Sequence, residues 1–110
     1  MAMAQKMLVI FIAETDMWQD ARLYAAIVTT LERQGIAGAT VNLGLMGYGR
    51  HRRIHRKGLF GVSDDKPVTI MAVDTEEKLR AVLPSIIPMV SEGLILLQDA
   101  EVILKSDSPI

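Results

Sequence analysis

The residues with the clearest chemical character form a run of cations near the middle of the sequence. The segment from Arg50 to Lys57 holds five of the twelve Lys and Arg residues and both His residues. Elsewhere seven bases face thirteen acids, so the remainder carries 7 − 13 = −6, although the whole chain carries only −1. Four of the five cations are Arg, whose planar guanidinium matches the geometry of a phosphate. The run therefore predicts a site for phosphates or for an acidic protein.

A glycine-rich segment leads into this run and reads Gly44-Leu45-Met46-Gly47-Tyr48-Gly49. Glycine tolerates positive φ and lets backbone amides approach an anion closely. The connection over about residues 46–66 shows neither strand nor helix periodicity and greatly exceeds the usual ~2–5 residues of a hairpin loop. Such a loop is usually functional or disordered. Because its cations repel one another, we predict that it is mobile and becomes ordered when an anion binds.

Other interpretations of these charged residues stay open. The cationic run can be a solvated loop that keeps the protein soluble. His51 and His55 have the i, i+4 spacing of two-histidine metal sites, but the neighbouring cations would repel a metal ion. Glu14, Asp16 and Asp20 cluster after the first apolar run and could hold a cation or act in catalysis. The simpler interpretation is that Asp20 caps a helix and that the other two carboxylates are solvated.

Composition excludes several classes of protein. The 110 residues are 50% hydrophobic and contain no Cys, which fits one domain over 1–110 without disulfides or thiolate chemistry. The longest apolar run, Met7 to Ala13, is too short to cross a membrane and makes a weak signal peptide. We therefore expect a cytoplasmic protein without membrane insertion. Serine-hydrolase, P-loop and Rossmann motifs are missing from the sequence, so no enzyme, catalytic residue, metal site or required cofactor is predicted.

Apolar periodicity places the elements that must position the basic run. Continuous apolar runs at Met7–Ala13 and Val68–Val73 predict central strands, and the alternation over Ala39–Leu45 predicts a strand near a sheet edge. Helical spacing predicts a helix over Ala21–Gln34, capped by Asp20 and ended by Gly35. A second helix begins at a capping box of Asp74 and Glu77, is interrupted by Pro84 and Pro88, and ends at Gly93. A last strand, bent in its middle, spans Leu94–Leu97 and Val102–Leu104, before a loose tail over 105–110.

The element order strand, helix, strand, strand, helix, strand indicates a ferredoxin-like α+β fold. In that plan the strands of an antiparallel four-stranded sheet follow the order 4-1-3-2, so the two most apolar strands occupy the middle. Both helices cover one face. The other face of so apolar a sheet, with a mean hydropathy of +0.27, predicts association with further copies of the chain.

Several motifs together resemble the family called domain of unknown function 190, a relative of the PII signal-transduction proteins. The resemblance covers residues 6–104 and rests on the stretches 35–41, 47–50, 65–68, 73–74 and 91–95, among them Gly47-Tyr48-Gly49-Arg50 and Ser91-Glu92-Gly93. It implies a PII-like trimer with ligands in the clefts between subunits and a T-loop after the second strand. It also implies a membrane transporter or channel as a protein partner. The glycine- and lysine-bearing loop and the C-terminal arginines of PII have no counterpart here.

These observations lead to one main hypothesis. The protein is a non-enzymatic trimeric regulator that binds a small anion, namely an adenine nucleotide (ATP, ADP or AMP), and signals through its basic loop. The predicted ligand-binding residues are Gly47, Tyr48, Gly49, Arg50, His51, Arg52, Arg53, His55, Arg56 and Lys57. Nucleic-acid binding by the same cations is the alternative, disfavoured by the overall acidity and by the few aromatic residues. A small enzyme using Glu14 or Asp16 is a third hypothesis.

Overall fold

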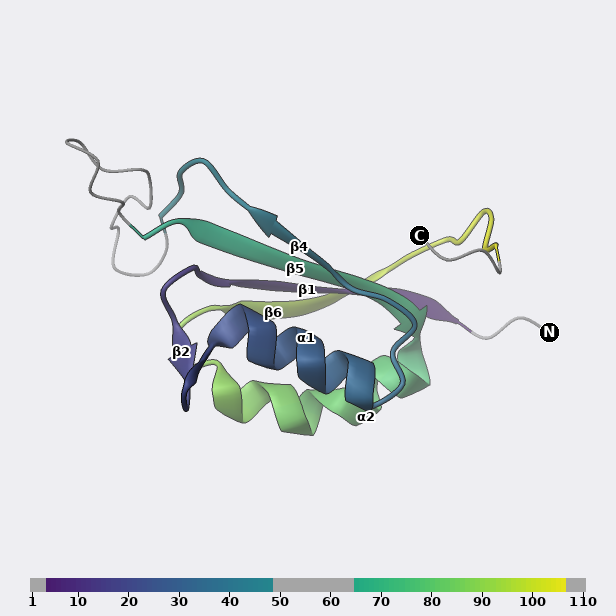
Figure 1. Ribbon diagram of the computed structural model, residues 1–110. Coiled ribbons are helices and arrows are strands. Elements are labelled where there is room, and N and C mark those ends of the chain that lie inside the picture. Colours follow the sequence, from purple (N-terminus) through teal and green to yellow (C-terminus); the bar gives the residue numbers. More distant parts are fainter. Residues whose placement is uncertain (1–3, 49–64, 107–110) are drawn as a thin grey trace.

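The computed structural model describes residues 4–48 and 65–106 and contains one four-stranded antiparallel sheet. Its strands are β1 (Gln5–Ala13), β4 (Thr40–Leu43), β5 (Pro67–Thr75) and β6 (Leu94–Asp99), in the order β4-β5-β1-β6. The helices α1 (Leu23–Arg33) and α2 (Glu76–Ile86) lie together on one face of this sheet (Figure 1). This is the predicted ferredoxin-like α+β arrangement, with the two most apolar strands in the middle.

The core lies between the sheet and the two helices. Because side chains alternate along a strand, β1 directs Leu8, Ile10 and Ile12 toward the helices. The same face of β5 contributes Val68, Ile70 and Ala72 to this core. The helices meet these residues with a stripe of buried side chains from each, which are Leu23, Ile27 and Leu31 of α1 and Leu79, Val82 and Ile86 of α2. Neither helix in the described part of the chain is long and apolar enough to span a bilayer.

Neither helix covers the opposite face of the sheet (Figure 1). Met7, Val9 and Phe11 of β1 point to this face, which we call the open face. The register sets Val9 beside Met71 on β5 and beside Leu96 on β6, while Phe11 lies opposite Leu94. Phe11 is 42% exposed and Leu94 is 54% exposed. The open face is therefore an apolar surface built across the central strands.

The start of α1 differs from the prediction. Met17–Trp18 (β2) and Ala21–Arg22 (β3) form a small antiparallel ribbon, which turns through Gln19 at φ 56° and Asp20. The helix therefore begins later than expected, its N-cap residue is Arg22, and no side chain caps it. The prediction that Asp20 caps this helix is wrong, because Asp20 lies in the turn of the ribbon. The end of α1 is as predicted, since Gly35 follows it at φ 85°.

The second helix begins one residue later than the predicted capping box. Thr75 is its N-cap and accepts a hydrogen bond from the Lys78 amide at 3.2 Å. Asp74 is still part of β5, faces the core, and is only 4% exposed. Its carboxylate accepts hydrogen bonds from the amides of Ala37 at 2.9 Å and of Thr75 at 2.7 Å. Asp74 thus joins the end of β5 to the connection between α1 and β4.

The C-terminal third confirms one prediction and corrects another. The second helix is divided into two pieces as expected, because α2 gives way to a 3₁₀ turn, η2 (Ile87–Met89), which contains Pro88. Pro84 does not interrupt it, since α2 continues through Pro84 to Ile86. The predicted last strand is too long, since β6 ends at Asp99 and Val102–Leu104 lies outside the sheet. The cause is geometric: strand β1, the partner of β6, begins at Gln5 and leaves nothing in the described chain for residues beyond Ala100 to pair with.

Removing the Asp74 carboxylate tests its structural role. We expect Asp74→Ala to lower the free energy of unfolding by about 2–3 kcal/mol, because the two amide donors lose their acceptor in a largely buried place. Asp20→Ala is the matched control and should change stability by less than about 0.5 kcal/mol, since Asp20 is exposed and caps no helix. Urea denaturation followed by circular dichroism measures both values. Equal losses in the two variants would contradict the assignment.

Candidate functional site

The two ends of the connection between β4 and β5 are held by backbone hydrogen bonds. The Gly44 amide, just after β4, donates to the Pro67 carbonyl at 2.7 Å. The Glu14 amide, just after β1, donates to the Lys66 carbonyl at 2.8 Å. The Thr15 amide donates to Oδ1 of Asp65 at 2.9 Å. Three separate segments are thereby joined at one end of the sheet, and we call this region the loop base.

Close contact between glycine and proline further restricts the loop base. A Cβ placed on Gly44 would lie 2.6 Å from Cγ of Pro67, and one on Gly47 would lie 3.3 Å from the same atom. Pro67 is the first residue of β5, a position that needs no backbone donor. The close passage of the chain over the proline ring therefore depends on the missing side chain at Gly44, and the fit at Gly47 is tight. The glycine pattern is explained here by packing, in addition to any approach of backbone amides to an anion.

Only the first two of the predicted ligand-binding residues lie in the described chain. Gly47 is half-buried against Pro67, and Tyr48 is 72% exposed at the point where the basic run begins. Leu45 and Met46 beside them are also exposed. The others lie outside the described residues, and they are Gly49, Arg50, His51, Arg52, Arg53, His55, Arg56 and Lys57. Of the predicted ligand-binding residues in the described chain, the loop base thus exposes Tyr48.

Sequence reasoning missed two residues of the loop base. Asp65 fixes the turn after β1 through Thr15, and Pro67 supports both glycines. Two features of the sequence could have indicated the role of Pro67. It directly precedes a continuous apolar strand, and Gly44 and Gly47 are spaced three apart. Asp65 gave no such signal, because its partner lies fifty residues away in the chain.

The acidic residues after β1 have a structural role. The Asp16 carboxylate accepts a hydrogen bond from the Ala13 amide at 2.9 Å, and its carbonyl accepts one from the Leu23 amide at 2.8 Å. Asp16 thus connects the end of β1 to the first turn of α1 and is half-buried instead of fully solvated. Within residues 4–48 and 65–106, no group of three His, Cys, Asp or Glu residues could hold a metal ion.

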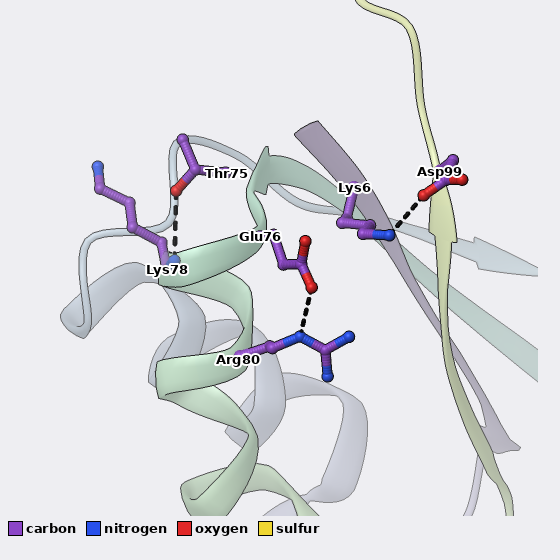
Figure 2. A network of polar contacts seen from close by, with 6 residues as sticks. All are labelled: Lys6, Thr75, Glu76, Lys78, Arg80 and Asp99. Atoms are coloured by element: carbon purple, nitrogen blue, oxygen red, sulfur yellow. Dashed lines mark hydrogen bonds and ion pairs between the residues drawn. The ribbon is translucent and has the colours of Figure 1, made fainter. Parts of the chain in front are cut away.

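A cluster of charges occupies the opposite end of the sheet (Figure 2). Lys6 on β1 bonds to Asp99 at the end of β6, and Arg80 donates from Nε to Oε2 of Glu76 at 2.6 Å. The hydrogen bond to Asp99 raises the pKa of Lys6, and the same bond lowers the pKa of Asp99. The hydrogen bond from Arg80 lowers the pKa of Glu76, and the nearby Lys6 lowers it further. The two pairs therefore form one network that joins β1, β6 and α2.

This fold is similar to that of solved PII-like proteins. A solved structure of CPII, a nitrogen regulatory PII-like protein from Thiomonas intermedia bound to ADP, AMP and bicarbonate, is similar with a TM-score of 0.66 and 25% identity. The match covers 89% of this chain and 87% of that one. PII from Arabidopsis thaliana, bound to citrate, shares the fold with a TM-score of 0.59 at 16% identity, over 89% of this chain and 78% of that one.

Sequence comparison identifies the family. The profile of the DUF190 family, described as "Uncharacterized ACR", matches residues 5–102, and the chain belongs to this family. A UPF0166 protein of Methanocaldococcus jannaschii is 38% identical over 98 residues, which is 88% of this chain and 90% of that protein. A UPF0166 protein of Aquifex aeolicus is 33% identical over 99 residues, covering 90% and 93%. The resemblance proposed from the motifs is confirmed.

A methyl group at Gly44 tests the packing of the loop base. We expect Gly44→Ala to lower the free energy of unfolding by about 1–3 kcal/mol, because the added carbon would overlap the Pro67 ring. Gly38→Ala is the control, since nothing lies within 4 Å of its added carbon; it should leave stability unchanged or raise it by up to about 1 kcal/mol. Denaturant titration of both variants gives the comparison. An equally stable Gly44→Ala protein would show that the contact is not tight.

Proposed function

We propose that the protein is a non-enzymatic PII-like regulator that binds an adenine nucleotide at the loop base and signals through the basic loop. The observation that carries the proposal is the loop base itself. Its three backbone-held segments fix both ends of a connection whose sequence holds five cations within eight residues. Because both ends of this connection are already fixed, fewer residues have to be ordered when a phosphate binds. The entropic cost of binding is therefore lower.

The ligand class is supported by likeness and by charge. CPII is described as bound to ADP, AMP and bicarbonate, and its match includes most of this chain. The predicted ligand-binding residues include four Arg, which donate paired hydrogen bonds to phosphate oxygens. Tyr48 is exposed immediately before them and offers an aromatic surface to a base. We therefore propose ADP, AMP or ATP as ligand, with Gly47 to Lys57 as the contacting segment and no cofactor required.

The open face supports assembly into a trimer, as the resemblance to PII proteins implies. Phe11 and Leu94 adjoin on neighbouring strands and are about half exposed in a single chain. Burying such a surface releases about 25 cal/mol for each Å² of apolar area. A cyclic trimer covers the same face in every subunit and leaves clefts between subunits near the loop base. In this proposal the trimer works in the cytoplasm, and its partner is a membrane transporter or channel that recognises the basic loop.

Ligand binding is tested with purified protein by isothermal titration calorimetry with ADP, AMP and ATP, each with and without bicarbonate. We expect at least one nucleotide to bind and to raise the melting temperature. Arg50→Gln should weaken that binding about tenfold or more, because a charged hydrogen bond to phosphate is lost.

Arg33→Gln, an exposed position in the last turn of α1, is the matched control and should bind as the wild type does. Failure of all three nucleotides to bind at millimolar concentration removes the ligand from the proposal. Binding of a DNA or RNA oligonucleotide that weakens steeply with salt would instead favour the nucleic-acid alternative.

Assembly is tested by sedimentation equilibrium. The chain has a mass of 12.1 kDa, so a trimer should sediment as three times this value, about 36 kDa. Phe11→Asp and Leu94→Asp should each give a folded monomer, because a charge on the open face cannot be buried without a partner. Thr29→Asp on the exposed side of α1 should stay trimeric. A wild-type protein that sediments as a monomer contradicts the proposed assembly.

A further inference from the structure

The segment that follows β6 exposes three consecutive large apolar side chains. Val102 is 40% exposed, Ile103 is 84% exposed and Leu104 is 85% exposed. Two of them are β-branched and favour extended strands. Glu101 precedes the three residues and Lys105 follows them. A short strand-forming sequence bounded by opposite charges is therefore left in solvent by the single chain, and we call it the apolar tail (Val102–Leu104).

A shallow apolar groove lies along the outer side of β6. It has a volume of about 400 Å³ and is lined by Arg80, Leu83, Ile87, Ile95, Leu96 and Leu97. β6 stands at the end of the sheet and pairs only with β1 within the described chain. The outward backbone groups of an edge strand can accept a further strand. The groove thus combines apolar walls with an available strand edge.

The charges at the two ends of this groove match those of the apolar tail. Arg80 stands at the end near Leu97, and its guanidinium is bonded to Glu76 through Nε alone. Figure 2 shows one of its terminal nitrogens directed away from Glu76. Glu92 precedes β6 at the other end. A tail that runs antiparallel to β6 would bring Glu101 to Arg80 and Lys105 to Glu92.

The chain geometry separates the apolar tail from its own groove. The Ala100 amide donates to the Gln5 carbonyl at 3.4 Å, so the backbone continues beside β1 after β6 ends. The bond between the side chains of Lys6 and Asp99 fixes the end of β6 at the same place (Figure 2). In the same chain, a tail that sets Glu101 beside Arg80 near Leu97 would have to turn within Gln98–Ala100, the residues that carry these two contacts. A groove on another protomer can be reached without that turn.

We propose that the apolar tail of one protomer lies as an antiparallel strand on the outer edge of β6 in a second protomer and fills its groove. This contact rests on the assembly proposed above and adds a second interface to it, separate from the open face. It buries in the groove whichever of Ile103 and Leu104 faces the groove, and it sets Glu101 and Lys105 beside the opposite charges of Arg80 and Glu92. The partner is therefore a second copy of this chain.

Cysteine crosslinking tests the contact directly, because the chain contains no Cys. Three mixtures of single variants are oxidised mildly and run on non-reducing gels: Ile103→Cys with Ile87→Cys, Leu104→Cys with Ile87→Cys, and Ile103→Cys with Leu45→Cys. Ile87 is 56% exposed in the groove, and Leu45 is 90% exposed at the loop base as the control. Neighbouring residues of a strand face opposite sides, so we expect one of the first two mixtures to give several-fold more mixed disulfide than the control.

Three results would overturn the proposal. They are mixed disulfide no higher than the control in both groove mixtures, a disulfide within one chain as the main product of the double variant Ile103→Cys/Ile87→Cys, and a monomeric wild type in sedimentation. The first two remove the tail contact alone if the wild type is still a trimer that binds nucleotide. The third also removes the proposed assembly, so the two failures can be told apart.

Discussion

The long antiparallel register between β1 and β5 is the constraint on which the other features depend. Nine residue pairs, from Gln5 with Thr75 to Ala13 with Pro67, align the two central strands. Alternation along this register sends one set of side chains to the helices and the other to the open face. A slip of one residue would exchange the two faces, placing Met7, Val9 and Phe11 in the core. The register also ends at Pro67, which sets the position of the loop base.

The same register separates two ends of different chemistry. Eight steps along β1 from Gln5 to Ala13 span about 27 Å. Close glycine and proline packing occupies one end, and the network of Lys6, Asp99, Glu76 and Arg80 occupies the other. The network is exposed apart from the half-buried Lys6 and Glu76, so it contributes little to stability and is weakened by salt. The main effect of the network is to fix the direction in which the chain leaves β6.

Hydrophobic patterning predicted the arrangement of the sheet, because continuous apolar runs mark strands that are covered by neighbours on both sides. Local capping rules failed where a short tertiary contact replaced them: the Asp16 carbonyl meets the first amide of α1, and Asp74 is drawn into the core by the Ala37 amide. Val102–Leu104 has the composition of a strand but lacks a partner strand among residues 4–48 and 65–106. Of the predicted site, only Gly47 and Tyr48 lie among the described residues, and both are at the loop base. The role of Asp65 could not be found from spacing, because its partner Thr15 is fifty residues away in the chain.

The separation of the two ends has a consequence for regulation. In the proposed assembly the apolar tail joins copies at the end far from the loop base, whereas the open-face pair Phe11 and Leu94 lies close to it, since Phe11 is two residues from Ala13. A nucleotide at the loop base would therefore lie near the open-face contact and far from the tail contact. We expect ligand and assembly to be coupled through the open face, because only there do the two sets of contacts adjoin. The tail contact can hold copies together whether or not a nucleotide is bound.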